Sequence, residues 1–291
     1  MSKPKVSLII TDLDNTLFDW VDMWYKSFSA MKEKILEISG ISEDTLLKAV
    51  KQVFQKHKTS EYSMLIQELT CLKEKHPNQD LTRIYQEAIR AYREARKAAL
   101  CLYPSVMETL LALKKRGCVI VGYTESLAFY SNYRVRKLGL DGVIDILYSP
   151  PDHDLPENLT PEQIRLYPPE HYELKFTKHK FTPKGKSKPN SLILESIIKD
   201  IGVPKAAAIY VGDSLMKDIA MAQEARVSDV WAKYGAVQHR PEYELLRKVT
   251  HWSEKQVGKE KQLSEKDIKP TYVLARFFKE LFNYFEFVKI N

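Results

Sequence analysis

The chain has 291 residues and a formal net charge of +7, and 44% of its residues are hydrophobic. This length exceeds one average domain, and the apolar content is ordinary for a globular protein with a buried core, so we expect one domain with a smaller second one. No apolar run is long enough to span a membrane, and the chain enters a strand-like segment without a signal sequence, which predicts a cytoplasmic protein without membrane contact. The three cysteines lack metal-ligand spacing, so reduced structural thiols are expected.

The first predicted strand covers residues 6–11 and is followed by two carboxylates, Asp12 and Asp14. In a parallel α/β sheet, catalytic groups gather beyond the carboxyl ends of the strands. Two like charges there either repel each other or share a cation. One carboxylate would be enough to cap a turn or helix. The pair therefore predicts a metal-assisted nucleophile.

Residues 19–102 are helix-like, with breaks near residues 39–41 and 56–60. Apolar side chains recur at helical spacing along this segment, which predicts the core of a helix bundle. Four side chains lie next to the first acidic pair and are candidates for hinge or substrate contacts, with packing as an equal alternative. They are Phe18, Asp19, Trp20 and Trp24.

Two further apolar runs predict buried strands, at residues 118–123 and 207–211. The first is followed directly by Thr124, and the second by Gly212 and Asp213, with Asp218 five residues after Asp213. Between them, Lys188 precedes an amphipathic helix. A strand-end hydroxyl beside a helix N-terminus can bind a phosphate oxygen. Taken alone, Thr124 is more typical of a helix cap and Lys188 of a solvated surface.

Taken in order, these motifs resemble those of the haloacid dehalogenase superfamily: Asp12-Leu13-Asp14-Asn15-Thr16, then Thr124, then Lys188-Pro189, then Gly212-Asp213-Ser214 with Asp218. The resemblance covers the core segments and implies an α/β fold, a doubly wound parallel sheet of Rossmann type, with an inserted helical cap of the C1 kind. The expected parts are a catalytic core at 1–18 and 103–237, a cap at 19–102, an insertion at 150–187 and a C-terminal extension at 238–291.

The resemblance also implies roles for these residues. Asp12 would be the nucleophile that forms an aspartyl phosphate, and Asp14 the general acid and base. Mg²⁺ would be held by Asp12, the backbone carbonyl of Asp14 and Asp213, with Asp218 supporting through a metal-bound water. Thr16 would orient the nucleophile. The expected phosphate-binding residues are Leu13, Asp14, Thr124, Glu125 and Lys188.

The insertion and the C-terminal extension have separate expectations. Asp152, His153 and Asp154 are more typical of a polar turn than of a metal site, and a short helix is predicted at 160–163. Alternating apolar residues predict a strand through Tyr172, Leu174 and Phe176. The aromatic-rich segment 272–287 is expected to dock on the core or on a partner chain.

We therefore expect a Mg²⁺-dependent phosphomonoester hydrolase acting on a small phosphorylated metabolite. A phosphomutase would share the catalytic set, and a binding protein on the same fold is a third alternative. A nucleotide or nucleic-acid-end phosphatase would use the lysines between Lys175 and Lys188, which we expect near the mouth of the cleft. A solvated surface is the simpler interpretation of these lysines, so nucleic acid is not favoured.

Overall fold

The computed structural model describes residues 2–152, 160, 167–262 and 267–289. The chain divides into two compact units. The core unit comprises Met1–Asp19, Leu102–Ala236 and Leu263–Asn291, and the helical unit comprises Trp20–Cys101 and Val237–Gln262. Among the described residues, no helix combines the length and the apolar content that a membrane crossing requires.

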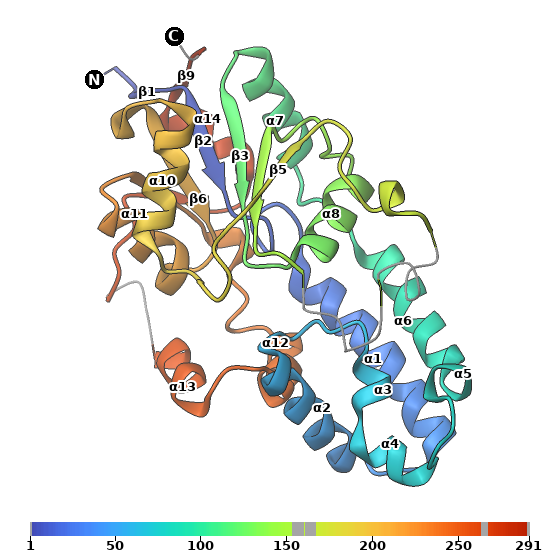
Figure 1. Cartoon of the computed structure of the whole chain (residues 1–291). Helices are drawn as coiled ribbons and strands as arrows, with labels where there is room; N and C mark the ends of the chain where they lie inside the picture. The colour runs from blue at the N-terminus through green and yellow to red at the C-terminus, as the bar shows by residue number, and fades with distance from the viewer. Residues whose placement is uncertain (1, 153–159, 161–166, 263–266, 290–291) are drawn as a thin grey trace. The chain divides into compact units, whose positions relative to one another are not determined.

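A seven-stranded, wholly parallel sheet forms the centre of the core unit (Figure 1). Its order is β5-β4-β3-β2-β6-β7-β8. The strands in that order are Lys178–Phe181, Ile146–Ser149, Val119–Tyr123, Leu8–Thr11, Ala208–Gly212, Ser228–Ala232 and Tyr272–Leu274. The predicted α/β class and parallel sheet are confirmed.

Helices cover this sheet, and the central strands are therefore buried on both faces. All of β2 and β6 is buried, which explains why these strands are uninterrupted apolar runs in the sequence. Apolar side chains of α10 and α11 join those of β2, β3 and β6 in one cluster, while α7 contacts β3. The α-helices in the described part of this unit are α7 (Val106–Lys115), α8 (Ala128–Lys137), α10 (Ser191–Ile201), α11 (Ala220–Glu224) and α14 (Leu281–Tyr284), and a π-helical turn, Leu215–Ile219, precedes α11.

The helical unit contains a large apolar cluster, which includes Trp24, Leu46, Val50, Leu246 and Val249. Its longest helices are α1 and α6, which pack against each other, and α2, whose first turn is capped by the Ser42 side chain. The helices are α1 (Trp20–Ser39), α2 (Glu43–His57), α3 (Leu65–Glu68), α4 (Thr70–Lys75), α5 (Leu81–Ile84), α6 (Gln86–Ala99), α12 (Pro241–Val249) and α13 (Glu254–Gln262).

The expected C-terminal extension at 238–291 is divided between the two units. Residues 237–262 belong to the helical unit, because Leu246 and Val249 of α12 are buried in its apolar cluster. The following segment returns to the core unit, where β8 forms an edge of the large sheet. Strand β9 (Glu286–Phe287) pairs with β1 (Lys5–Val6). The predicted docking of the aromatic segment on the core is confirmed.

The insertion differs from its prediction. The strand expected at 172–176 is wrong, and β5 begins at Lys178 instead. The Asp141 carboxylate accepts the backbone N–H groups of Lys175, Phe176 and Thr177 at 2.8, 3.0 and 2.8 Å, so these amides are not available to a sheet. The helix expected at 160–163 lies outside the described residues apart from Thr160, as do His153 and Asp154.

Candidate active site

The site lies at β2, where the strand order reverses: β3 and β4 lie on one side of β2, and β6 and β7 lie on the other. Strand β2 lies between β3 and β6, and Thr11 is in register with Gly122 on one side and Val211 on the other. The residues that follow these three central strands therefore all lie at the carboxyl ends of the strands, at the topological switch point where α/β proteins bind their ligands. The backbone N–H of Asp12 donates to the carbonyl of Val211 at 2.8 Å, which fixes the start of the first loop.

This first loop is folded tightly. Asn15 has a φ of 58°, in the left-handed region that Asn tolerates better than most residues. The N–H groups of Thr16 and Leu17 donate to the carbonyl of Leu13 at 3.2 and 2.8 Å. A Cβ atom at Gly235 would lie 1.7 Å from the carbonyl oxygen of Asn15, so only glycine permits this approach.

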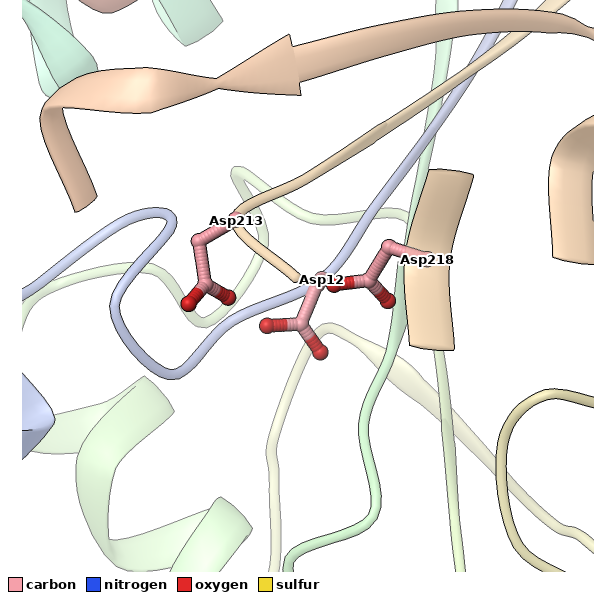
Figure 2. Close-up of side chains that lie close together, drawn as sticks. All are labelled: Asp12, Asp213 and Asp218. Atoms are coloured by element: carbon pink, nitrogen blue, oxygen red, sulfur yellow. The ribbon is translucent and has the colours of Figure 1, made fainter. Parts of the chain in front are cut away.

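Three carboxylates converge at the site: Asp12, Asp213 and Asp218 (Figure 2). All three are buried, and each offers an oxygen within 4.8 Å of the others. Burial raises the pKa of Asp12 to about 7, against the opposing effect of Lys188, and Asp218 adds to the rise. Burial and the neighbouring carboxylates of Asp218 and Asp12 raise the pKa of Asp213 well above its usual range. An all-oxygen cluster whose ionised form is this costly fits a hard divalent cation such as Mg²⁺.

Lys188 is the buried cation beside this cluster. Its Nζ atom donates to Asp12 Oδ1 at 2.5 Å and to Asp218 Oδ1 at 3.0 Å. Burial opposes the charge of Lys188, but the two carboxylates raise its pKa well above its usual value, so it stays protonated. Its backbone N–H donates to Glu125 Oε1 at 2.9 Å, and Glu125 Oε2 accepts from Lys217 Nζ at 2.5 Å. Glu125, which follows β3, thus holds the backbone at Lys188 next to the end of that strand.

Asp14 lies at the same strand end but has different partners. Its Oδ2 atom accepts from the hydroxyls of Ser126 at 2.6 Å and Thr124 at 3.3 Å, and its Oδ1 atom from Nη1 of Arg134 at 3.1 Å. The structure therefore brings Thr124 beside the second acid. The two carboxylates of the first motif face different surroundings, which is typical of a pair with two different roles.

Thr16 lies between two of the clustered acids. Its hydroxyl is 3.4 Å from Asp12 Oδ2 and 3.5 Å from Asp213 Oδ1, at the outer limit of hydrogen bonding, and its carbonyl accepts from the Tyr234 hydroxyl at 2.6 Å. The indole of Trp231 donates to the Asp213 carbonyl at 2.7 Å. The expected neighbours of Thr16 are thus present, and its orienting role stays a prediction.

The aromatic candidates for substrate contact are mostly packing residues. Phe18 is fully buried in the core unit, and Trp24 is buried in the helical unit, where its indole donates to the Ser60 carbonyl at 3.0 Å. The indole of partly exposed Trp20 donates to Glu61 at 3.2 Å. Asp19 is partly exposed at the end of the first core segment.

Two expectations outside the main motifs can also be placed. Asp152 accepts the Phe129 N–H at 2.6 Å in the first turn of α8, as a capping residue would. All three cysteines are free, and Cys118 is buried.

Sequence reasoning missed four side chains that the fold brings to the site. Ser126 and Arg134 bind Asp14, Lys217 binds Glu125, and the Tyr210 hydroxyl donates to Asp218 Oδ1 at 2.9 Å. The only sequence feature that favoured Tyr210 was its place in a buried strand, where a phenol needs a partner. Lys217 and Arg134 are ordinary helix residues by pattern, and only the tertiary fold reveals that they face inward.

Comparisons with known proteins indicate one family of hydrolases. A family model of haloacid dehalogenase-like hydrolases matches residues 6–167, and one described as HAD-hydrolase-like matches residues 186–279. A glyceraldehyde 3-phosphate phosphatase of Methanopyrus kandleri is 24% identical over 240 residues, which cover 80% of this chain and 86% of the relative.

Solved structures resemble the fold over nearly the whole chain. A 2-haloacid dehalogenase of Pseudomonas syringae has a TM-score of 0.55 at 17% identity, with 96% of this chain and 97% of that chain covered. A HAD-hydrolase of Bacillus subtilis, bound to magnesium, has a TM-score of 0.52 at 15% identity, with 96% and 98% covered. With a family match over more than half of its length and the family's motifs assembled at one sheet edge, the chain belongs to the haloacid dehalogenase-like hydrolases.

Proposed function

We propose that the protein hydrolyses a phosphomonoester, with Asp12 as nucleophile and Asp14 as general acid and base. The observation that carries this proposal is the separation of the two carboxylates: Asp12 joins the acidic cluster and Lys188, whereas Asp14 binds hydroxyls and Arg134. An attacking carboxylate needs cations beside it, whereas an acid–base carboxylate needs a separate position, outside the acidic cluster, from which it can reach the leaving oxygen.

The reaction would take two displacements at phosphorus. An oxygen of Asp12 attacks the phosphorus, the bond from phosphorus to the leaving oxygen breaks, and protonated Asp14 gives that oxygen its proton. Water then attacks the phosphorus of the aspartyl phosphate, and Asp14 takes a proton from the water. The bond between phosphorus and Asp12 breaks, which releases phosphate and restores both residues.

The residues around Asp12 would lower the electrostatic cost of this attack. Asp12, Asp213 and Asp218, with the Asp14 carbonyl, would hold Mg²⁺, which when bound offsets the negative charge of the substrate and of the cluster. The Lys188 ammonium, fixed by Glu125, would bind a phosphoryl oxygen. Thr124 and the backbone of the first loop are the further phosphate-binding candidates.

The leaving group is proposed to be a small phosphorylated metabolite. The named relative supports this class, and a triose phosphate is the first compound to test. Lys180 of the basic insertion is ion-paired with Asp200 of α10, so part of the positive charge there is already compensated within the core unit. This favours a small ester over a nucleic-acid end.

The test is a panel of triose, sugar and nucleotide phosphates and phosphoglycolate, assayed with Mg²⁺ and without a bisphosphate activator. We expect phosphate release that Asp12→Asn lowers by about a thousandfold or more, because the attacking charge is lost while the side-chain shape is kept. Asp44→Asn, on the exposed face of α2, is the matched control and should not change the rate. Transfer to a second substrate position without phosphate release would instead identify a phosphomutase.

A further inference from the structure

Arg134 is a fully buried arginine with a defined partner set. It lies on α8, its side chain is 2% exposed, and its guanidinium carbon is 5.9 Å from the ring centroids of both Phe18 and Tyr130. Removing a guanidinium from water is costly unless its hydrogen bonds are satisfied inside. A charge held in such a place has either a structural or a functional use.

Its contacts converge on the second acid of the first motif. Nη1 of Arg134 donates to Asp14 Oδ1 at 3.1 Å and to the Ser126 hydroxyl at 2.8 Å. The Ser126 hydroxyl in turn donates to Asp14 Oδ2 at 2.6 Å. Arginine, serine and aspartate therefore form a closed triangle in which both carboxylate oxygens are held.

The Ser126 corner of this triangle is itself fixed by the backbone. Its N–H donates to Thr124 Oγ1 at 3.0 Å, and its carbonyl accepts from the Ser131 hydroxyl at 2.8 Å. The end of β3 and the first turns of α8 thus define where the Ser126 hydroxyl points. A change in that hydroxyl would be transmitted to Asp14.

We propose that Arg134 and Ser126 are positioning residues that set the orientation of the Asp14 carboxylate for proton transfer to the leaving oxygen. This inference rests on the proposed function. A free aspartate side chain rotates about two bonds, whereas contacts to both oxygens fix its plane. Oδ2 accepts from both Ser126 and Thr124, so Oδ1, which accepts from Arg134, is the oxygen that would hold a proton toward the substrate while the triangle stays closed.

The leaving group separates positioning from a purely structural use. Alkyl phosphates need protonation of the departing oxygen, whereas an activated aryl phosphate departs without it. We expect Arg134→Met to lower kcat for an alkyl ester by about tenfold to a hundredfold, with the aryl ester changed less than about threefold. Arg134→Lys, which keeps the charge, should restore part of the alkyl rate.

Further variants make the test decisive. Ser126→Ala should show the same selective loss with less risk to folding, and Lys137→Met, exposed on the same helix, should change neither ester. In the Asp14→Asn background, Arg134→Met should add nothing for the alkyl ester, because the acid through which it acts is gone. An equal loss for both esters, or full additivity, would overturn the proposal.

A crystallographic comparison separates this inference from the proposed function. In Ser126→Ala and Arg134→Met crystals, we expect the Asp14 carboxylate to be rotated or divided between conformers, and to be unchanged in Lys137→Met. If both variants leave Asp14 in its place, the positioning role is wrong whatever the activity. If Asp14 moves but the wild type hydrolyses neither ester, the proposed function is wrong, and what stands is that Arg134 and Ser126 fix the orientation of the Asp14 carboxylate.

Discussion

At the residue scale, the cluster of Asp12, Asp213 and Asp218 depends on neighbouring glycines, which have no side chain, as well as on the acids themselves. A Cβ atom at Gly212 would lie 2.4 Å from both Cγ and Oδ2 of Asp218, and one at Gly122 would lie 2.9 Å from Leu13 Cδ1. Strand β6 therefore ends in glycine because the Asp218 carboxylate occupies the space that a side chain would fill. The glycine of the Gly-Asp-Ser motif is therefore required by the packing of Asp218, six residues further along the chain.

Gly212→Ala should accordingly displace Asp218 and weaken the cluster. We expect phosphatase activity to fall by about tenfold or more, with a higher Mg²⁺ concentration needed for half-maximal rate, because misplacing one ligand costs binding energy. Gly258→Ala is the matched control, since a Cβ atom there meets nothing within 4 Å. Wild-type activity and Mg²⁺ dependence in Gly212→Ala would show that Asp218 does not support the metal.

At the element scale, the success of sequence reasoning followed the burial of each strand. Strands β2, β3 and β6 are buried almost throughout and were predicted to within two residues from their apolar runs. Edge strand β5 reads Lys-His-Lys-Phe and has no such pattern. Its position depends on pairing with β4 and on the Asp141 carboxylate, which holds the preceding amides. Both are long-range effects that no local pattern contains.

The same limit applied to the site. The strand-end residues Asp12, Asp14, Thr124 and Asp213 could be found because each follows an apolar run. The partner Arg134 could not, since its contact with Asp14 joins residues 120 positions apart in the chain. Motif reasoning thus found the groups expected to touch the substrate and missed the groups that hold them.

In the helical unit, Glu68 of α3 ties α2 to the loop that follows it. Its carboxylate accepts from Lys56, His57 and the Tyr62 hydroxyl. Burial opposes ionisation, but these hydrogen bonds lower the pKa of Glu68 to about 2, from an ordinary value of 4.5. A lowered pKa means stabilisation that is complete above the unfolded value and lost as the pH falls through the folded value.

Glu68→Gln should therefore lower the free energy of unfolding by about 1–2 kcal/mol at pH 7. The difference from wild type should shrink as the pH falls from about 4.5 toward 2, because the wild-type carboxylate becomes protonated over this range. Urea unfolding followed by circular dichroism at several pH values measures this, with exposed Glu33→Gln as control. A difference that does not change with pH would mean that the carboxylate charge is not the stabilising feature.

At the scale of the whole molecule, the balance of charge at the site predicts a link between metal and stability. Three buried carboxylates, Asp12, Asp213 and Asp218, face the buried ammonium of Lys188, so a divalent cation should bind the folded state in preference to the unfolded chain. Adding Mg²⁺ should raise the Tm of the wild type by several degrees, as about 1–3 kcal/mol of binding energy would.

Asp213→Asn should abolish most of this Mg²⁺-dependent shift, whereas Asp44→Asn should keep it. Differential scanning fluorimetry with and without a chelator provides the comparison, and it needs no substrate. A shift produced by Zn²⁺ but not by Mg²⁺ would contradict the all-oxygen site, because oxygen-only ligands suit the harder ion.

The chain passes between its two units more than once. The chain leaves the core unit after Asp19, returns at Leu102, leaves again after Ala236 and returns at Leu263. The second excursion was not expected, because the α12 sequence shows an amphipathic helix without showing which apolar cluster its buried face joins. A cap that closes over the phosphate remains a prediction for the helical unit.

The most direct test of the central claim is to trap the covalent intermediate. The protein is mixed with Mg²⁺ and its best phosphate ester, quenched, and treated with borohydride, which reduces an acyl phosphate to the alcohol and leaves a free carboxylate untouched. Peptide mass spectrometry should then find homoserine in place of Asp12, dependent on substrate and absent in Asp12→Asn. Turnover with no reduction at Asp12, or with reduction at another carboxylate, would contradict the assignment of Asp12 as nucleophile.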